Sequence, residues 1–149
     1  MSKHILIVHG FLLSGTGSNI YSCNVAMQWK KQNHAVTIFC QDPDAGTYDW
    51  VDEFFTKNDE LPQEQVAPGK VRVILPDIAG LLPVYQYDEY KGYTTKTIPN
   101  FTDEEIERYS YCFFLTVFKC LVIKSLIQNF DSPLPNLSSV FSFKTSITL

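Results

Sequence analysis

His4-Ile5-Leu6-Ile7-Val8-His9 is a continuous apolar run that ends at Gly10, and the turn Phe11-Leu12-Leu13-Ser14-Gly15-Thr16-Gly17 follows it. An unbroken run with β-branched residues is typical of a strand that is buried on both faces of a parallel sheet. The glycines allow the backbone to turn sharply after the strand. A helix is expected from about residue 20 to residue 33, with Ser18 or Asn19 as its cap.

The strand and helix are followed by Ala35-Val36-Thr37-Ile38-Phe39-Cys40, a second predicted strand. Together these segments form a βαβ unit. Val71-Arg72-Val73-Ile74-Leu75 predicts a third strand, which Pro76 ends. Residues 41–69 are polar and are expected to be mostly loop, with a short helical turn near 48–55, whereas 78–84 fits no single element. Residues 85–100 are expected to form a long ordered loop. The predicted fold class is α/β, a Rossmann-like three-layer domain with a mainly parallel sheet.

The third quarter of the chain contains Thr102-Asp103-Glu104-Glu105, the pattern of a helix capping box. Apolar residues recur after it at three- and four-residue steps, beginning with Ile106 and Tyr109. They predict an amphipathic helix of about 25 residues. Residues 131–149 change in character, with Pro133, Pro135 and many serines. We therefore expect one domain over residues 1–130 and a poorly ordered tail over 131–149.

Composition limits the classes of function. The chain has 149 residues and is 45% hydrophobic, which is enough for one core, and its net charge of -4 argues against a nucleic-acid partner. No apolar run is long enough to span a bilayer, and the start lacks a secretory signal, so we expect a cytoplasmic protein. The 4 cysteines have neither Cys-x-x-Cys spacing nor a neighbouring histidine. They are expected to be buried thiols, with no metal site.

The glycine turn is the candidate binding element. Free amides between a buried strand and a helix start favour an anion, most simply a phosphate, although the glycines are equally consistent with turn geometry alone. A P-loop would need Lys-Ser or Lys-Thr where Thr16-Gly17 stands. A dinucleotide-binding fingerprint would need a third glycine at the position of Ile20. Asp42, just after the second predicted strand, could still accept a hydrogen bond from a ribose hydroxyl. An NAD-dependent oxidoreductase therefore stays open as an alternative. A serine hydrolase lacks its Gly-x-Ser-x-Gly elbow.

Residues 4–42 resemble the amino-terminal domain of family-4 glycosyltransferases, which are retaining enzymes with two Rossmann domains (GT-B). That family has a Gly-Gly-x-Asn-x-Tyr-like turn and a Gly-His-x-Val-x-hydrophobic strand. The counterparts here are Gly15-Thr16-Gly17-Ser18-Asn19-Ile20-Tyr21 and His34-Ala35-Val36-Thr37-Ile38. The segments 82–85, 88–93 and 101–106 also resemble some bacterial members. The likeness covers about residues 1–129.

The resemblance implies sugar transfer from a nucleotide-sugar to a sugar or polyol acceptor, with no further cofactor. It implies that this domain binds the acceptor and that the glycine turn faces the phosphates of the donor. The site residues carried over are Gly15, Thr16, Gly17, Ser18 and Asn19. His9 joins them because ligands bind at the carboxyl ends of parallel strands, although a structural imidazole explains it equally well. Lys91 and Lys96 could meet an anionic acceptor, or be ordinary surface lysines.

The chain departs from the family in two ways. Thr16 replaces a glycine of the Gly-Gly pair, and the second Rossmann domain is missing, together with its donor-binding Arg/Lys pair and Glu-x7-Glu element. We therefore expect a chain truncated after about residue 130 that is inactive alone and needs a separate carboxy-terminal Rossmann domain. The alternative from another class is a non-catalytic split subunit or interaction module.

Overall fold

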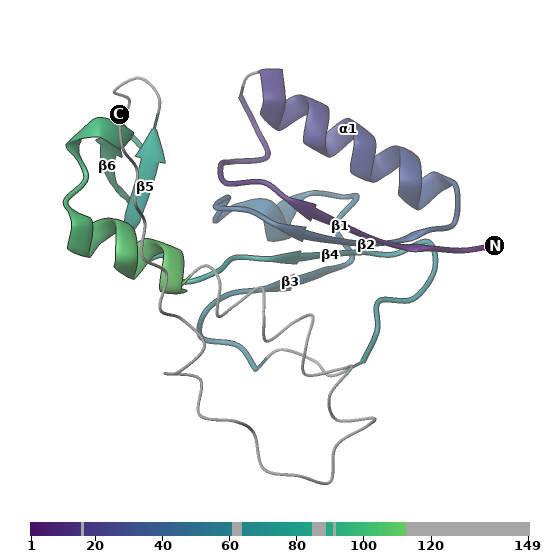
Figure 1. The fold of residues 1–149 in the computed structure, drawn as a ribbon. Helices are drawn as coiled ribbons and strands as arrows, with labels where there is room; N and C mark the ends of the chain where they lie inside the picture. The colour runs from purple at the N-terminus through teal and green to yellow at the C-terminus, as the bar shows by residue number, and fades with distance from the viewer. Residues whose placement is uncertain (16, 61–63, 85–88, 91, 113–149) are drawn as a thin grey trace, which may run out of the picture.

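A four-stranded parallel sheet organises the amino-terminal part of the chain (Figure 1). The computed structural model describes residues 1–15, 17–60, 64–84, 89–90 and 92–112. The strands are β1 (His4–Val8), β2 (Ala35–Phe39), β3 (Glu53–Phe55) and β4 (Val71–Ile74), in the order β1-β2-β4-β3. The helix α1 (Gly17–Lys31) connects β1 to β2. The predicted α/β class with a mainly parallel sheet is confirmed.

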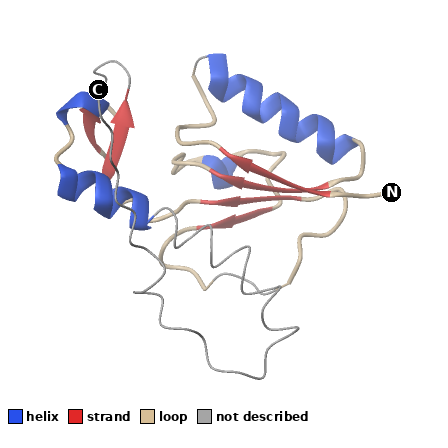
Figure 2. Cartoon of the chain, viewed as in Figure 1, coloured by secondary structure: helices blue, strands red, loops and turns tan. Residues whose placement is uncertain are grey.

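The main core lies between α1 and one face of the sheet (Figure 2). Val36 and Ile38 of β2 and Val71 and Val73 of β4 are fully buried there, beneath Ala26 of α1. These alternate residues point to the same face because side chains in a strand alternate. The described residues thus show two layers of the predicted three.

The first strand is less buried than its sequence suggests. Leu6 is 36% exposed and Val8 is 53% exposed, so the prediction of burial on both faces is wrong. The physical reason is the strand order, which puts β1 at the edge of the sheet beside β2 alone. Ile20 of α1 is also 49% exposed.

Residues 41–69 contain more regular structure than predicted. A 3₁₀ turn, η1, spans Ala45–Thr47, and β3 pairs in parallel with β4. The helical turn predicted near 48–55 is limited to one turn, in which the Val51 amide donates to the Tyr48 carbonyl oxygen at 2.9 Å. It goes no further because Glu53 and Phe55 are held in an extended strand by their partners on β4. Glu53 lies opposite Arg72, whose Nε donates to its carboxylate at 2.5 Å, and the Arg72 guanidinium lies over the Phe55 ring.

A smaller two-stranded parallel sheet lies beyond the carboxyl ends of the four strands (Figure 1). It consists of β5 (Leu81–Val84) and β6 (Thr94–Thr97), which is followed by the 3₁₀ turn η2 (Ile98–Asn100). The expectation of loop throughout 85–100 is therefore wrong. The unassigned stretch 78–84 supplies β5, and its Ile78, Leu82 and Val84 form a second buried cluster.

The helix that covers this second cluster begins as predicted. The Glu105 amide donates to Thr102 Oγ1 at 3.2 Å, and the Thr102 amide donates to the Glu105 carboxylate at 3.0 Å, which confirms the capping box. The helix is described over residues 103–112, where Tyr109 packs on the cluster. Its predicted continuation and the tail 131–149 lie outside the described residues.

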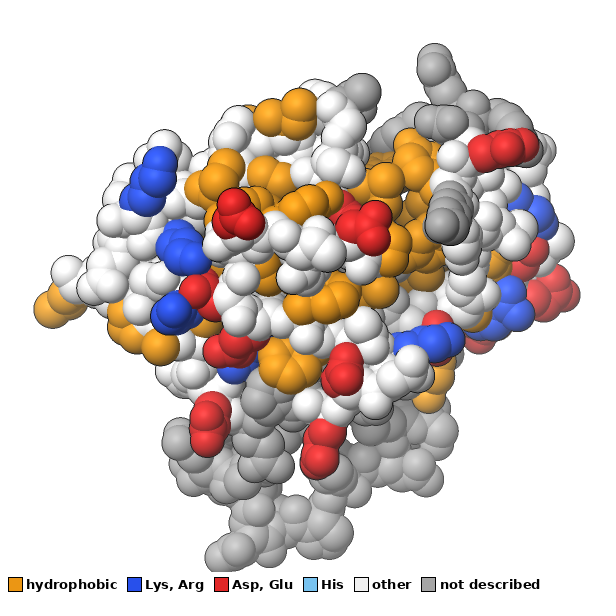
Figure 3. Space-filling view, turned by 180° about the vertical axis from the view of Figure 1, so that it is seen from behind, with side chains coloured by type: hydrophobic (Ala, Val, Ile, Leu, Met, Phe, Trp, Pro, Cys, Tyr) orange, Lys and Arg blue, Asp and Glu red, His pale blue; other side chains and the backbone are white. Residues whose placement is uncertain are grey.

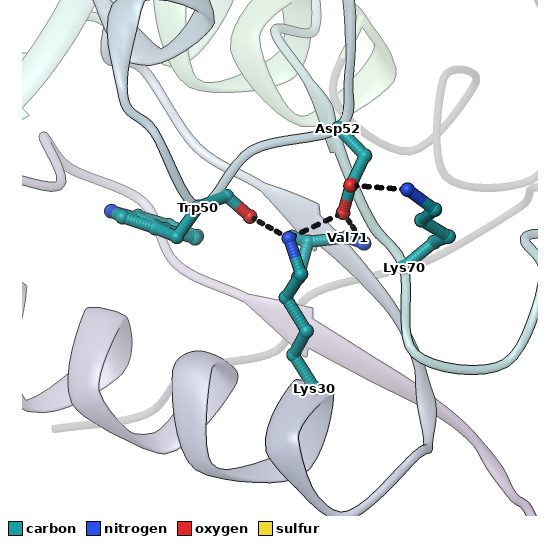
Figure 4. A network of polar contacts seen from close by, with 5 residues as sticks. All are labelled: Lys30, Trp50, Asp52, Lys70 and Val71. Atoms are coloured by element: carbon teal, nitrogen blue, oxygen red, sulfur yellow. Dashed lines mark hydrogen bonds and ion pairs between the residues drawn. The ribbon is translucent and has the colours of Figure 1, made fainter.

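At the opposite, amino-terminal edge of the sheet, Asp52 joins three elements (Figure 4). Its carboxylate accepts from Lys30 of α1 at 2.7 Å, from Lys70 at 2.9 Å and from the Val71 amide at 2.8 Å. Lys30 also donates to the Trp50 carbonyl oxygen. This network connects the end of α1 to the starts of β3 and β4.

Candidate functional site at the carboxyl edge of the sheet

The glycine turn lies at the carboxyl end of β1, where the sequence places it. Gly15 has a φ of +99°, a conformation that favours glycine, and Gly17 is the first residue of α1. Among the described residues, the amides of Ser14, Gly15, Gly17 and Ser18 donate to no partner, whereas the Leu13 amide donates to Asp42. Thr16 lies outside the described residues. The turn thus keeps several amides available at an exposed position.

His9 and Asn19 come together, but they are held by each other and by the turn. His9 Nε2 lies 2.9 Å from Asn19 Oδ1 and 3.0 Å from the Leu12 carbonyl oxygen. Both are acceptors, so Nε2 carries the proton and Nδ1 faces the Ser22 hydroxyl at 3.4 Å. Asn19 Nδ2 donates to the Ser14 carbonyl oxygen at 2.7 Å. These contacts give both side chains a role in shaping the turn, and their role toward a ligand stays a prediction.

Asp42 is a buried carboxylate that lies shortly after the carboxyl end of β2. It is 2% exposed, and it accepts hydrogen bonds from the Leu13 amide at 2.9 Å, the Tyr48 hydroxyl at 2.8 Å and the Asp44 amide at 3.0 Å. The carboxylate therefore ties the glycine turn to the segment after β2. Because it is covered, it offers no open surface to a ribose.

A cleft of about 300 Å³ opens beside this segment, at the carboxyl ends of β2, β4 and β3. Its wall on the far side comes from the loops that flank β5 and β6. Ligands of open parallel sheets bind at this edge, so the position favours a binding site. The lining residues are Gln41, Pro43, Thr56, Lys57, Asn58, Leu75, Pro76, Asp77, Ile78, Gly80, Gly92 and Tyr93.

One wall of the cleft is fixed by a hydrogen bond from Tyr93. Its hydroxyl donates to the Gln41 carbonyl oxygen at 2.9 Å and lies 3.3 Å from Gln41 Oε1. Burial, and the nearby Cys40 and Asp42, raise the pKa of Tyr93 to about 12, so it remains a neutral hydroxyl at physiological pH. This wall therefore presents a phenol ring, hydrogen-bonded through its hydroxyl, beside the buried Gln41 side chain.

The other wall carries exposed polar groups. Lys57 Nζ lies 3.7 Å from Asp77 Oδ1, and both side chains remain about half exposed. The side-chain amide of Asn58 makes no hydrogen bond to another described residue. An ammonium, a carboxylate and an amide together can donate to and accept from a polyhydroxylated ligand.

The glycine turn and this cleft are two separate features, because no residue of the turn lines the cleft. The segment 40–44 separates them: the Gln41 amide donates to the Phe11 carbonyl oxygen at 2.9 Å, while the Gln41 side chain lines the cleft. Lys96, the other predicted anion contact, donates to Glu105 at 2.6 Å, and Lys91 lies outside the described residues. Sequence reasoning missed the cleft, although Gln41 and Pro76 directly follow two predicted strands.

Comparison with known proteins gives no relative. No family model matches this chain. No curated protein and no solved structure matches it either. The family resemblance described above therefore stays a prediction, and the site must be judged on its own geometry.

Two properties of the described residues bear on other classes of site. They contain no group of three or more His, Cys, Asp or Glu that could hold a metal ion, and no helix among them could cross a bilayer. Acidic and basic side chains are both scattered over the face shown in Figure 3.

Cys23 and Cys40 are buried as predicted, and burial raises the pKa of the Cys40 thiol to about 12. Neither thiol is suited to act as a nucleophile at neutral pH.

Proposed function

We propose that this chain is the acceptor-side, Rossmann-like domain of a nucleotide-sugar-dependent glycosyltransferase of the GT-B type, and that it is inactive alone. The observation that carries the proposal is the cleft at the carboxyl ends of β2, β3 and β4, whose lining combines apolar residues with Lys57, Asn58 and Asp77. The glycine turn, with its available amides, lies at the same end of the sheet, across the segment 40–44. A sugar or polyol acceptor fits the cleft because its hydroxyls need mixed donors and acceptors. The cleft supplies these from Lys57, Asn58 and Asp77, with Tyr93 as a flat wall.

The turn has the complementary task in this proposal. When the glycosidic bond of the donor breaks, charge develops on the leaving diphosphate, and fixed amide donors lower the energy of that state. The amides of Gly15, Gly17 and Ser18 are placed at a helix start, where an anion is also favoured by the helix dipole. The donor itself would be held mainly by a separate carboxy-terminal Rossmann domain.

Removing the polar side chains of Lys57 and Asn58 is expected to weaken acceptor binding in the cleft. The double variant Lys57→Ala and Asn58→Ala should lose at least about nine-tenths of the affinity for a monosaccharide or polyol, because each lost hydrogen bond to a charged or amide group costs about 1 kcal/mol. Saturation-transfer NMR with glucose and myo-inositol at millimolar concentration measures this. Lys31→Ala, at the exposed end of α1, is the matched control. Equal signals for the double variant and the wild type would refute an acceptor site in the cleft.

Replacing Gly17 with valine is expected to weaken diphosphate binding at least tenfold while the fold remains. An added Cβ at Gly17 would meet no heavy atom within 4 Å, so the side chain is tolerated, but it stands where a phosphate must approach the backbone. The binding of UDP, followed by the chemical shifts of the amides of residues 14–19, measures the loss. Unchanged affinity with an intact spectrum would show that the turn is only structural.

A further inference from the structure

The outer edge of β1 carries main-chain groups that find no partner among the residues that the structure describes. The Lys3 carbonyl oxygen accepts from Ala35 at 2.9 Å and the His9 amide donates to Phe39 at 2.8 Å, so these residues direct their main chain toward β2. Because the direction alternates along a strand, the N–H and C=O groups of Leu6 and Val8 point away from β2. Within the described part of the chain, these four groups make no hydrogen bond.

The side chains of the same two residues are also uncovered. Leu6 is 36% exposed and Val8 is 53% exposed. Protein sheets commonly block an open edge with a charge, a proline or a bulge. Residues 4–8 contain no Lys, Arg, Asp, Glu or Pro, and β1 pairs with β2 without a bulge. Apolar side chains therefore lie beside main-chain groups that no described residue pairs with.

We propose that β1 pairs with β1 of a second copy of this chain, across a two-fold axis at Ile7. A two-fold axis at a sheet edge makes the two strands antiparallel, with the same patch contributed by each copy. Leu6 then lies opposite Val8 of the second copy, and the two residues exchange both N–H···O=C bonds. The symmetric pair repeats this, so the four unpaired groups of each copy are all satisfied. The result is one continuous sheet through both copies.

In this register, apolar side chains of the two copies lie beside one another and no like charges meet. Each Leu6 side chain packs beside Val8 of the second copy on the same face, which covers the two exposed residues together. Lys3 is the one charged residue among residues 3–11, and it faces Phe11 of the second copy, so no like charges meet. The strand is thus self-complementary, which favours a second copy over the strand of an unrelated protein. This inference does not depend on the proposed function.

Sedimentation velocity of the full chain tests the pairing. We expect the wild type to form a dimer with rising concentration, and Val8→Lys to weaken the dimer at least tenfold, because a lysine on an edge strand opposes pairing with a second strand. Ile98→Lys is the matched control, since Ile98 is 51% exposed and lies away from β1; it should dimerise like the wild type. Circular dichroism melts check that all three proteins are folded.

Hydrogen exchange locates the contact independently of any substitution. The amides of Leu6 and Val8 should exchange slowly in the dimer and at least tenfold faster on dilution, whereas amides bonded within the sheet, such as that of Ile38, should change little. A wild type that stays monomeric at every concentration overturns the proposal. So does a dimer that Val8→Lys leaves unchanged, or one in which the Leu6 and Val8 amides gain no protection.

Discussion

Replacing Asp42 with alanine is expected to lower the free energy of unfolding by about 3–5 kcal/mol, because it removes a buried acceptor of three hydrogen bonds. The carboxylate is 2% exposed and accepts from Leu13, Asp44 and Tyr48. Alanine would leave the Leu13 amide and the Tyr48 hydroxyl without an acceptor, and each such buried donor costs about 1–3 kcal/mol. The loss would also release the glycine turn from the segment after β2.

Urea denaturation followed by circular dichroism measures this change. Asp44→Ala is the matched control, because Asp44 is exposed and its side chain makes no cap hydrogen bond to η1. It should cost about 0.5 kcal/mol or less, as surface substitutions usually do. A cost below about 1 kcal/mol for Asp42→Ala would mean that the carboxylate does not hold the turn.

Local signals made the first half of the fold predictable. The β-branched runs at 4–8, 35–39 and 71–74 are strands, and a helix follows the glycine turn as predicted. It begins at Gly17, so Ser18 and Asn19 lie within its first turn and do not precede it as caps. The capping box at Thr102 was predicted to the atom, because its two hydrogen bonds depend only on residues three positions apart. Each of these features is decided within a few residues.

The remaining elements depend on partners far along the chain. The three residues of β3 become a strand because β4 pairs with them and Arg72 reaches Glu53. In the same way β5 and β6 support each other, although Thr94–Thr97 alone has no apolar pattern. The exposure of Leu6 and Val8 follows from the position of β1 in the sheet order, which a single strand sequence does not encode.

The two parts of the candidate site also differ in how far they could be predicted from the sequence. The glycine turn is contiguous in sequence, so its residues could be named in advance. The cleft is assembled from four short segments at 41–43, 56–58, 75–80 and 92–93, and three of them follow or precede strands that sequence patterns do not reveal. Tyr93 reaches Gln41 across 52 positions of the chain, a contact that only the folded arrangement provides.

A second large effect is expected at Asp52, and it depends on pH. Burial by itself raises the pKa of this carboxyl, but hydrogen bonds from Lys30, Lys70 and the Val71 amide outweigh it and lower the pKa from 3.8 to about 2 (Figure 4). A folded-state pKa below the unfolded value contributes stability above about pH 4, and that contribution is lost as the pH falls toward 2. Because Lys70 is 53% exposed and its ion pair is screened, we expect about 1–2 kcal/mol from this ionisation.

Asp52→Asn isolates the stability that comes from the ionised carboxylate, because asparagine keeps an acceptor for the Val71 amide but cannot ionise. Above pH 5 the variant should be less stable than the wild type by about 1–2 kcal/mol, and the gap should close as the pH approaches 2. Asp52→Ala should cost about 2–3 kcal/mol at neutral pH, since it also leaves the Val71 amide unpaired. Denaturation curves at several pH values measure both, with the exposed Asp49→Asn as control. A gap between wild type and Asp52→Asn that is constant from pH 6 to about pH 2 would show that the carboxylate charge does not stabilise the junction of α1 with β3 and β4.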